Sequence, residues 1–273
     1  MRIKDILLVA RAGEVCEALL AATALIATEH GAMVEGVCVY SEPDLSSSAS
    51  ARGGGDLLAH RKEAIERHVA PIETAYRAMI ADHGLSSSWS VGEAEERTWA
   101  LIRQARFADL VVAGLPGEDS LARRLAESLA MNSGAPCLLV PCSANVERFD
   151  RVMLAWDGSR EAKIAMDNSL VFMRAAKSVR VIIAHEGADA AFYEAHGAQV
   201  LGHLSRHDVQ AELKVVSKPG EKIGEVLLGE CKAFTPDMLV MGAYGHAQAR
   251  EMVLGGATRA MLAQAGQPVL MSH

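Results

Sequence analysis

Residues 242–258 read "GAYGHAQAREMVLGGAT" and carry glycines at both ends. Two glycines stand three residues apart, nine residues follow the second one, and a glycine pair then precedes a threonine. An apolar run comes before this stretch and an alanine-rich run after it, so we expect it to join a strand to a helix. Helix N-termini suit phosphate, and glycine lets a backbone approach a ligand. The stretch therefore predicts either a phosphate site or two structural turns.

The strand that leads into this stretch has a copy earlier in the chain. The segment "TPDMLVMGAYG" from Thr235 aligns with "FADLVVAGLPG" from Phe107. The identical pairs are Asp109/Asp237, Val112/Val240, Gly114/Gly242 and Gly117/Gly245. Further upstream, "DILLVARAG" from Asp5 aligns with "DRVMLAWDG" from Asp150. Because the matches occur in the same order, the sequence predicts two homologous halves.

Each half alternates apolar strand patterns with amphipathic helix patterns. This alternation predicts an α/β fold of two tandem doubly wound domains, each with a five-stranded parallel sheet covered on both faces. We place the domains at residues 1–143 and 149–273, with the seam in the polar stretch 141–150. The Ser- and Gly-rich residues 41–56 are extra in the first half and predict a loop. In the second half, strands are expected at 152–156, 179–185, 211–216, 237–242 and 268–272, and helices at 159–176, 191–207, 223–234 and 257–266.

Composition narrows the class of protein. The chain has 273 residues, and its low aromatic content of 4% predicts aliphatic cores. A net charge of −7 argues against nucleic acid as a partner. No window holds the roughly 18 uncharged apolar residues of a membrane span. The N-terminus reads as strand, turn and helix rather than as a signal peptide. We therefore expect a cytoplasmic protein whose five cysteines are reduced thiols, most of them buried.

The first strand of the second half ends in a polar turn. The segment "VMLAWDGS" closes with Asp157, Gly158 and Ser159. An aspartate at the carboxyl end of a strand can accept hydrogen bonds from a ligand amine or hydroxyl. Alternatively, Asp157 or Ser159 caps the following helix, and the two interpretations are compatible. A Walker loop is excluded because no lysine follows the glycines, and no GxGxxG fingerprint follows a strand.

These motifs together resemble a known family. The spacing Gly-x2-Gly-x9-Gly, the leading "WDGS" and the closing "PVLMS" are similar to the universal stress protein family, and they resemble it over nearly the whole chain as two tandem copies. The resemblance implies a Rossmann-like, adenine nucleotide alpha hydrolase-like fold and a stress-response or regulatory protein that binds ATP, with or without Mg²⁺. It also implies site residues: Asp157 at the adenine, the main chain near His185 lining the adenine pocket, Gly242, Gly245 and His246 at the ribose and phosphates, and Gly255, Gly256, Ala257 and Thr258 at the phosphates.

One position departs from the family pattern. Where the family has Ser or Thr directly after the third glycine, this chain has Gly256, so a hydroxyl is lost while the backbone N–H remains. Thr258 supplies a hydroxyl two residues later.

The first half lacks most of the implied site. The aspartate position falls on Ala12, Arg123 and Arg124 stand in place of the glycine pair, and Ala126 stands in place of Thr258. We therefore predict that one adenine nucleotide binds in the second half. The first half would be its structural partner in an internal pseudo-dimer. A homodimer of the whole chain and an unidentified protein partner remain open.

Two other functions are weighed against nucleotide regulation. His246, Arg250, Glu251 and Arg259 are the candidates for ATP hydrolysis, but no base, nucleophile or metal is assigned, so at most slow hydrolysis is expected. A nucleotide-free interaction scaffold is the other alternative. His196, His203 and His207 have spacing suited to one helix face. However, no glutamate, cysteine or carboxylate completes a metal set, so we expect surface histidines and no metal site.

Overall fold

The computed structural model describes residues 2–40, 54–115, 120–185, 190–243 and 256–273. The first half consists of β1 (Asp5–Arg11), α1 (Glu17–His30), β2 (Met33–Tyr40), α3 (Gly54–His83), β3 (Ser87–Glu93), α4 (Ala94–Ala105), β4 (Leu110–Leu115), α5 (Ser120–Asn132) and β5 (Cys137–Pro141). The second half consists of β6 (Arg151–Ala155), α6 (Arg160–Ala175), β7 (Ser178–His185), α7 (Ala190–Arg206), β8 (Glu212–Ser217), α8 (Ile223–Phe234), β9 (Met238–Gly242), α9 (Gly256–Gln264) and β10 (Val269–Ser272).

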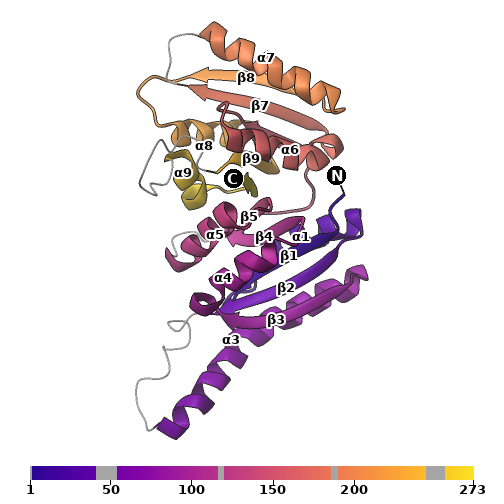
Figure 1. Cartoon of the computed structure of the whole chain (residues 1–273), viewed down its shortest axis with the longest axis vertical. Helices are drawn as coiled ribbons and strands as arrows, with labels where there is room; N and C mark the ends of the chain where they lie inside the picture. The colour runs from indigo at the N-terminus through magenta and orange to yellow at the C-terminus, as the bar shows by residue number, and fades with distance from the viewer. Residues whose placement is uncertain (1, 41–53, 116–119, 186–189, 244–255) are drawn as a thin grey trace.

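All the strands belong to one ten-stranded sheet of order β3-β2-β1-β4-β5-β10-β9-β6-β7-β8. Within each half every pairing is parallel, and both halves have the same strand order. Figure 1 shows the two halves as successive parts of this sheet, with the first half in indigo to magenta and the second in pink to yellow. The predicted fold class is therefore confirmed.

Helices cover both faces of the sheet because successive strand residues point in opposite directions. In β1, Ile6 and Leu8 join one buried cluster, while Leu7 and Val9 join the other. The first cluster lies under α1, α3, α6 and α7, and the second lies under α4, α5, α8 and α9. Each half is thus doubly wound, and the aromatic-poor core is aliphatic as expected.

The predicted loop over residues 41–56 needs one correction. Residues 41–53 lie outside the described part of the chain, but Gly54 is already the first residue of α3, so the last three residues of that stretch are helical. In the described residues, no helix has both the length and the apolar composition needed to cross a membrane.

The two halves meet at an antiparallel pair of equivalent strands, β5 and β10. Leu138 pairs with Leu270, and both side chains are fully buried in the same cluster. When Pro136 is aligned with Pro268, these two leucines also occupy the same position in their halves. A pseudo-two-fold axis therefore passes through this pair, as in an isologous dimer interface.

The repeated aspartates have a structural role at the opposite end of the sheet. Asp109 Oδ2 accepts hydrogen bonds from the backbone N–H groups of Lys4 (2.7 Å) and Asp5 (3.1 Å). Asp237 Oδ2 accepts one from the N–H of Arg151 (2.8 Å). In each half this carboxylate ties the start of the fourth strand to the start of the first. The repeat therefore preserves a folding contact that is remote from the predicted ligand site.

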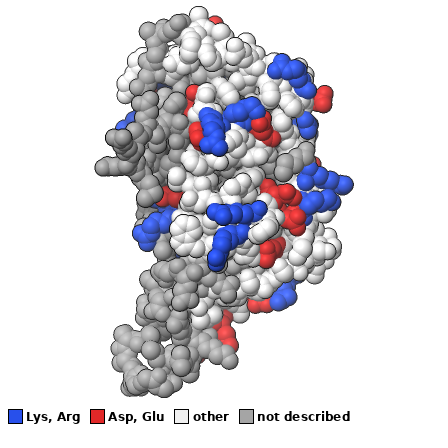
Figure 2. All heavy atoms as spheres, viewed as in Figure 1, with Lys and Arg blue, Asp and Glu red and all other residues white. Residues whose placement is uncertain are grey.

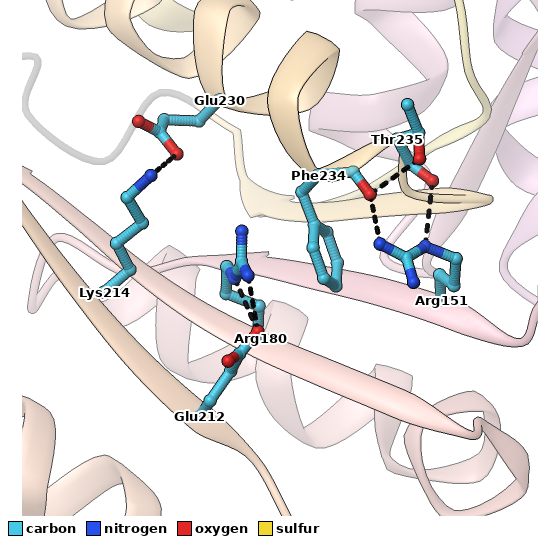
Figure 3. A network of polar contacts seen from close by, with 7 residues as sticks. All are labelled: Arg151, Arg180, Glu212, Lys214, Glu230, Phe234 and Thr235. Atoms are coloured by element: carbon cyan, nitrogen blue, oxygen red, sulfur yellow. Dashed lines mark hydrogen bonds and ion pairs between the residues drawn. The ribbon is translucent and has the colours of Figure 1, made fainter.

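Cation–aromatic packing fixes the end of α8 in the second half (Figure 3). The guanidinium carbons of Arg151 and Arg180 lie 4.4 and 4.0 Å from the centroid of the Phe234 ring. Arg151 also donates hydrogen bonds to the backbone carbonyls of Phe234 and Thr235, where a helix C-terminus favours a cation. Arg180 pairs with Glu212 at 2.7 Å, and Lys214 of β8 pairs with Glu230 of α8. These contacts anchor α8 to β6, β7 and β8.

The expectation of five reduced thiols is wrong for two of them. Cys16, at the N-cap of α1, forms a disulfide with Cys142, which directly follows β5. The two are 126 residues apart, so only the packing of α1 beside β5 brings their sulfurs together. Cys38, Cys137 and Cys231 are buried free thiols, and burial raises the pKa of each to about 12. These three therefore match the expected small buried apolar residues.

The Leu138–Leu270 pair is expected to stabilise the junction cooperatively. Each single change, Leu138→Ala or Leu270→Ala, should lower the free energy of unfolding by about 2–5 kcal/mol, because each leaves a cavity in a packed core. The double variant should lose less than the sum, by about 0.5–3 kcal/mol, because the two side chains face one another. Chemical denaturation of the four proteins measures this coupling, and strictly additive losses would contradict the pairing.

Candidate functional site

The second half has a topological switch point between β6 and β9. From β6 the chain passes through α6 to β7 on one side, and from β8 it passes through α8 back to β9 on the other side of β6. In open α/β sheets, ligands bind beyond the carboxyl ends of the strands at such a point. Asp157 follows β6 by two residues, and Gly242 is the last residue of β9. The fold therefore brings these two predicted site residues to neighbouring strand ends.

The polar turn after β6 is held by side-chain acceptors. Asp157 is exposed, and its Oδ1 accepts a hydrogen bond from Ser159 N–H (2.9 Å). Ser159 is the N-cap of α6, and its Oγ accepts from Ala162 N–H (3.1 Å). Gly158 between them has φ +80°, a conformation that favours glycine. The predicted cap is thus confirmed for Ser159, while the Asp157 carboxylate is oriented at the strand end by the same turn.

Gly242 has a packing role that the sequence did not indicate. A Cβ built at this position would lie 2.5 Å from Ala162 N and 2.6 Å from Glu161 C. Only glycine therefore allows the first turn of α6 to approach β9 this closely. The equivalent Gly114 in the first half has no atom of a described residue within 4 Å of its added Cβ.

The first turn of α9 contains Gly256, Ala257 and Thr258. Another glycine, Gly224 of α8, sets its position, since an added Cβ would lie 2.5 Å from Ala260 Cβ and 3.2 Å from Gly256 O. Sequence reasoning missed Gly224, although a glycine within an apolar helix is a recognised sign of close packing. Thr258 is only 3% exposed, so its side chain is buried within this turn. Gly256 itself meets no described atom within 4 Å of an added Cβ.

His185 is the last residue of β7, on the other side of β6. Its side chain is buried, and its ring stacks on Tyr193 of α7 with centroids 3.9 Å apart. This stacking holds the side chain against α7. Three other predicted site residues, Gly245, His246 and Gly255, lie outside the described residues, as do Arg250 and Glu251.

His203 of α7 and His207, which directly follows this helix, lie close together, as their spacing indicated. The rings of His203 and His207 are 4.6 Å apart, and His203 Nε2 lies 3.6 Å from Asp167 Oδ1. Burial is the main cause that lowers the pKa of His203. Within the described ranges, no three His, Cys, Asp or Glu side chains are grouped so that they could hold one metal ion.

The strand register corrects one alignment with the first half. Ile6 pairs with Leu110, and Val152 pairs with Met238 at the matching position. Counting along both strands from these pairs shows that Arg11, not Ala12, is the equivalent of Asp157 in the first half. The sequence alignment was one residue out because it paired Asp5 with Asp150, whereas the register pairs Asp5 with Arg151. The conclusion that the first half has no carboxylate there is unchanged, but the position carries a cation.

The two halves differ at the helix after the fourth strand. Ala126 and Thr258 are both buried, as equivalent helix positions should be. However, α9 begins at Gly256, whereas α5 begins at Ser120, so the counterparts Arg123 and Arg124 lie inside α5. The backbone N–H groups of Arg123 and Arg124 come after the first described turn of α5, so they are not at an open end of that helix. The first half therefore carries two helical arginines where the second half has its glycine pair.

The comparisons agree with this geometry. Residues 148–273 match the model of the Universal stress protein family. The matched segment is nearly the whole C-terminal half of the chain. A universal stress protein from Archaeoglobus fulgidus DSM 4304 is similar over 100% of this chain and 99% of its own, with a TM-score of 0.73 and 14% identity. The functionally unknown protein PA1789 from Pseudomonas aeruginosa PAO1 is similar over 99% of this chain and 92% of its own, with a TM-score of 0.66 and 13% identity.

At these identities the two structures show a shared fold. Both extend over essentially both halves of this chain, so the tandem α/β architecture inferred from the sequence is shared with them. Among curated proteins, no sequence matches this chain.

Gly242 and its equivalent in the first half, Gly114, are expected to respond differently to substitution by alanine. Gly242→Ala should lower the free energy of unfolding by about 1–3 kcal/mol, because the added methyl overlaps the backbone of α6. Gly114→Ala is the matched control and should change it by less than about 1 kcal/mol. Thermal and denaturant unfolding of both variants measure the difference. Equal losses in the two variants would contradict the close approach of α6 to β9.

Proposed function

We propose that the C-terminal half binds one adenine nucleotide, ATP, at the switch point between β6 and β9. The chain would then act as a stress-response regulatory protein whose nucleotide state controls its contacts with another protein. The observation that carries this proposal is the difference between two otherwise equivalent halves. Only the second half combines a carboxylate after its first strand with a glycine pair at the position that Arg123 and Arg124 of α5 occupy in the first half.

The start of α9 suits the phosphates. The first N–H groups of a helix have no partner within it, and the helix dipole adds partial positive charge there. No described side chain fills the space beside Gly256. A phosphate can therefore approach the backbone of Gly256 and Ala257. Mg²⁺ would arrive with the nucleotide, because no carboxylate group in the described residues forms a ready site for it.

The turn after β6 suits the base. Asp157 is exposed and already oriented by its bond from Ser159 N–H. A carboxylate in this position can accept hydrogen bonds from the adenine amine or from a ribose hydroxyl. The main chain at His185 would form the opposite wall. Gly245, His246 and Gly255 complete the proposed set by resemblance to the family.

Binding of ATP by the full-length chain tests the proposal. Titration calorimetry should give about one site per chain, and Asp157→Ala should weaken binding at least tenfold, because a hydrogen bond to a charged acceptor is lost. Arg11→Ala changes the equivalent residue of the first half and is the matched control, with an expected change of less than about twofold.

Two results would overturn the proposal. One is a stoichiometry of two equivalent sites. The other is an unchanged affinity in Asp157→Ala with an unchanged melting temperature. Phosphate release in the same samples separates a binding role from slow hydrolysis, and complete absence of binding would favour the nucleotide-free scaffold.

A further inference from the structure

The first half contains a cavity at the carboxyl ends of its own strands. It has a volume of about 740 Å³ and lies beyond β1, β4 and β5, bounded by α1 and α5. The end of α9, including Gln264, forms part of its wall, so both halves contribute to it. Its volume is within the range of pockets that hold small organic molecules, roughly 300–1,000 Å³.

The inner wall of this cavity is apolar. It includes Ala12, Leu19, Leu20, Leu115, Ala126 and Leu129. Ala126 occupies the position at which the second half has Thr258, and it is 2% exposed. In α5, Arg123 and Arg124 also stand where the second half has its glycine pair. The space that corresponds to a nucleotide site has therefore become an apolar one.

The mouth of the cavity is polar and carries both charges. Arg11 and Glu14 are exposed there, and Ser143 is exposed beside them. The Cys16–Cys142 disulfide forms part of the same wall and joins α1 to the segment after β5. Figure 2 shows a similar mixture elsewhere, with Lys and Arg side chains close to Asp and Glu on the described part of the face in view. A mouth with opposite charges does not select an ionic ligand.

We propose that this cavity binds a small, uncharged organic molecule with a mainly apolar surface. Such a molecule would lose contact with water along the Ala and Leu wall, and the hydrophobic effect would drive its binding. A triphosphate would instead meet neither the glycine pair nor a hydroxyl in place of Thr258. The proposal concerns a different half from the nucleotide site, so each can fail without the other.

The uncharged fluorescent probe N-phenyl-1-naphthylamine tests the proposal on the full-length chain. Its fluorescence should rise to saturation at about one probe per chain. Ala12→Leu should weaken binding at least tenfold, because the added side chain occupies the cavity. Ala81→Leu makes the same substitution at an exposed position of α3 that does not line the cavity, and its affinity should remain within about twofold.

A second variant guards against a folding defect in Ala12→Leu. Leu20 is half-buried on α1 and lines the cavity, so Leu20→Trp should also block the probe while the melting temperature stays near that of the unchanged chain. Saturating ATP should not displace the probe. Non-saturable probe binding, equal affinity in Leu20→Trp and Ala81→Leu, or displacement by ATP would each overturn the proposal.

Discussion

The antiparallel pairing of β5 with β10 joins the two halves into one sheet. Because Leu138 faces its own counterpart, Leu270, the same strand from each half forms both sides of the contact. Two separate chains could make such a contact only at sufficient concentration, whereas one chain makes it intramolecularly. The covalent link thus fixes each half beside its partner and allows the two halves to differ.

The halves differ where a ligand would bind and agree where the fold is held together. Asp109 and Asp237 make the same backbone contacts at the amino ends of the strands. At the carboxyl ends, Arg11 is the equivalent of Asp157, and Arg123 and Arg124 of α5 are the equivalents of Gly255 and Gly256. The first half thereby gains an apolar cavity in place of a polar turn. A doubly wound sheet tolerates such changes because its strand-end loops carry few core contacts.

Much of the fold was readable from periodicity, because strands buried on both faces and amphipathic helices leave distinct patterns. The strands and helices of the second half lie within one or two residues of their predicted ranges. The packing of Gly242 was not readable, since close approach depends on which helix lies opposite, whereas Gly224 within an apolar helix was a signal that the prediction missed. The disulfide was missed for the same reason, because its cysteines meet only in the folded chain. The equivalence of Arg11 with Asp157 became clear only from the strand register, which the sequence alignment alone could not supply.

The two halves share one fold, and we infer that they differ in ligand chemistry. Photolabelling with 8-azido-ATP, followed by peptide mapping of the full-length chain, tests this inference most directly. The account predicts that labelled peptides come from residues 148–273 and that unlabelled ATP suppresses the label. Labelling of peptides around β1 and α5 to a similar extent would contradict it.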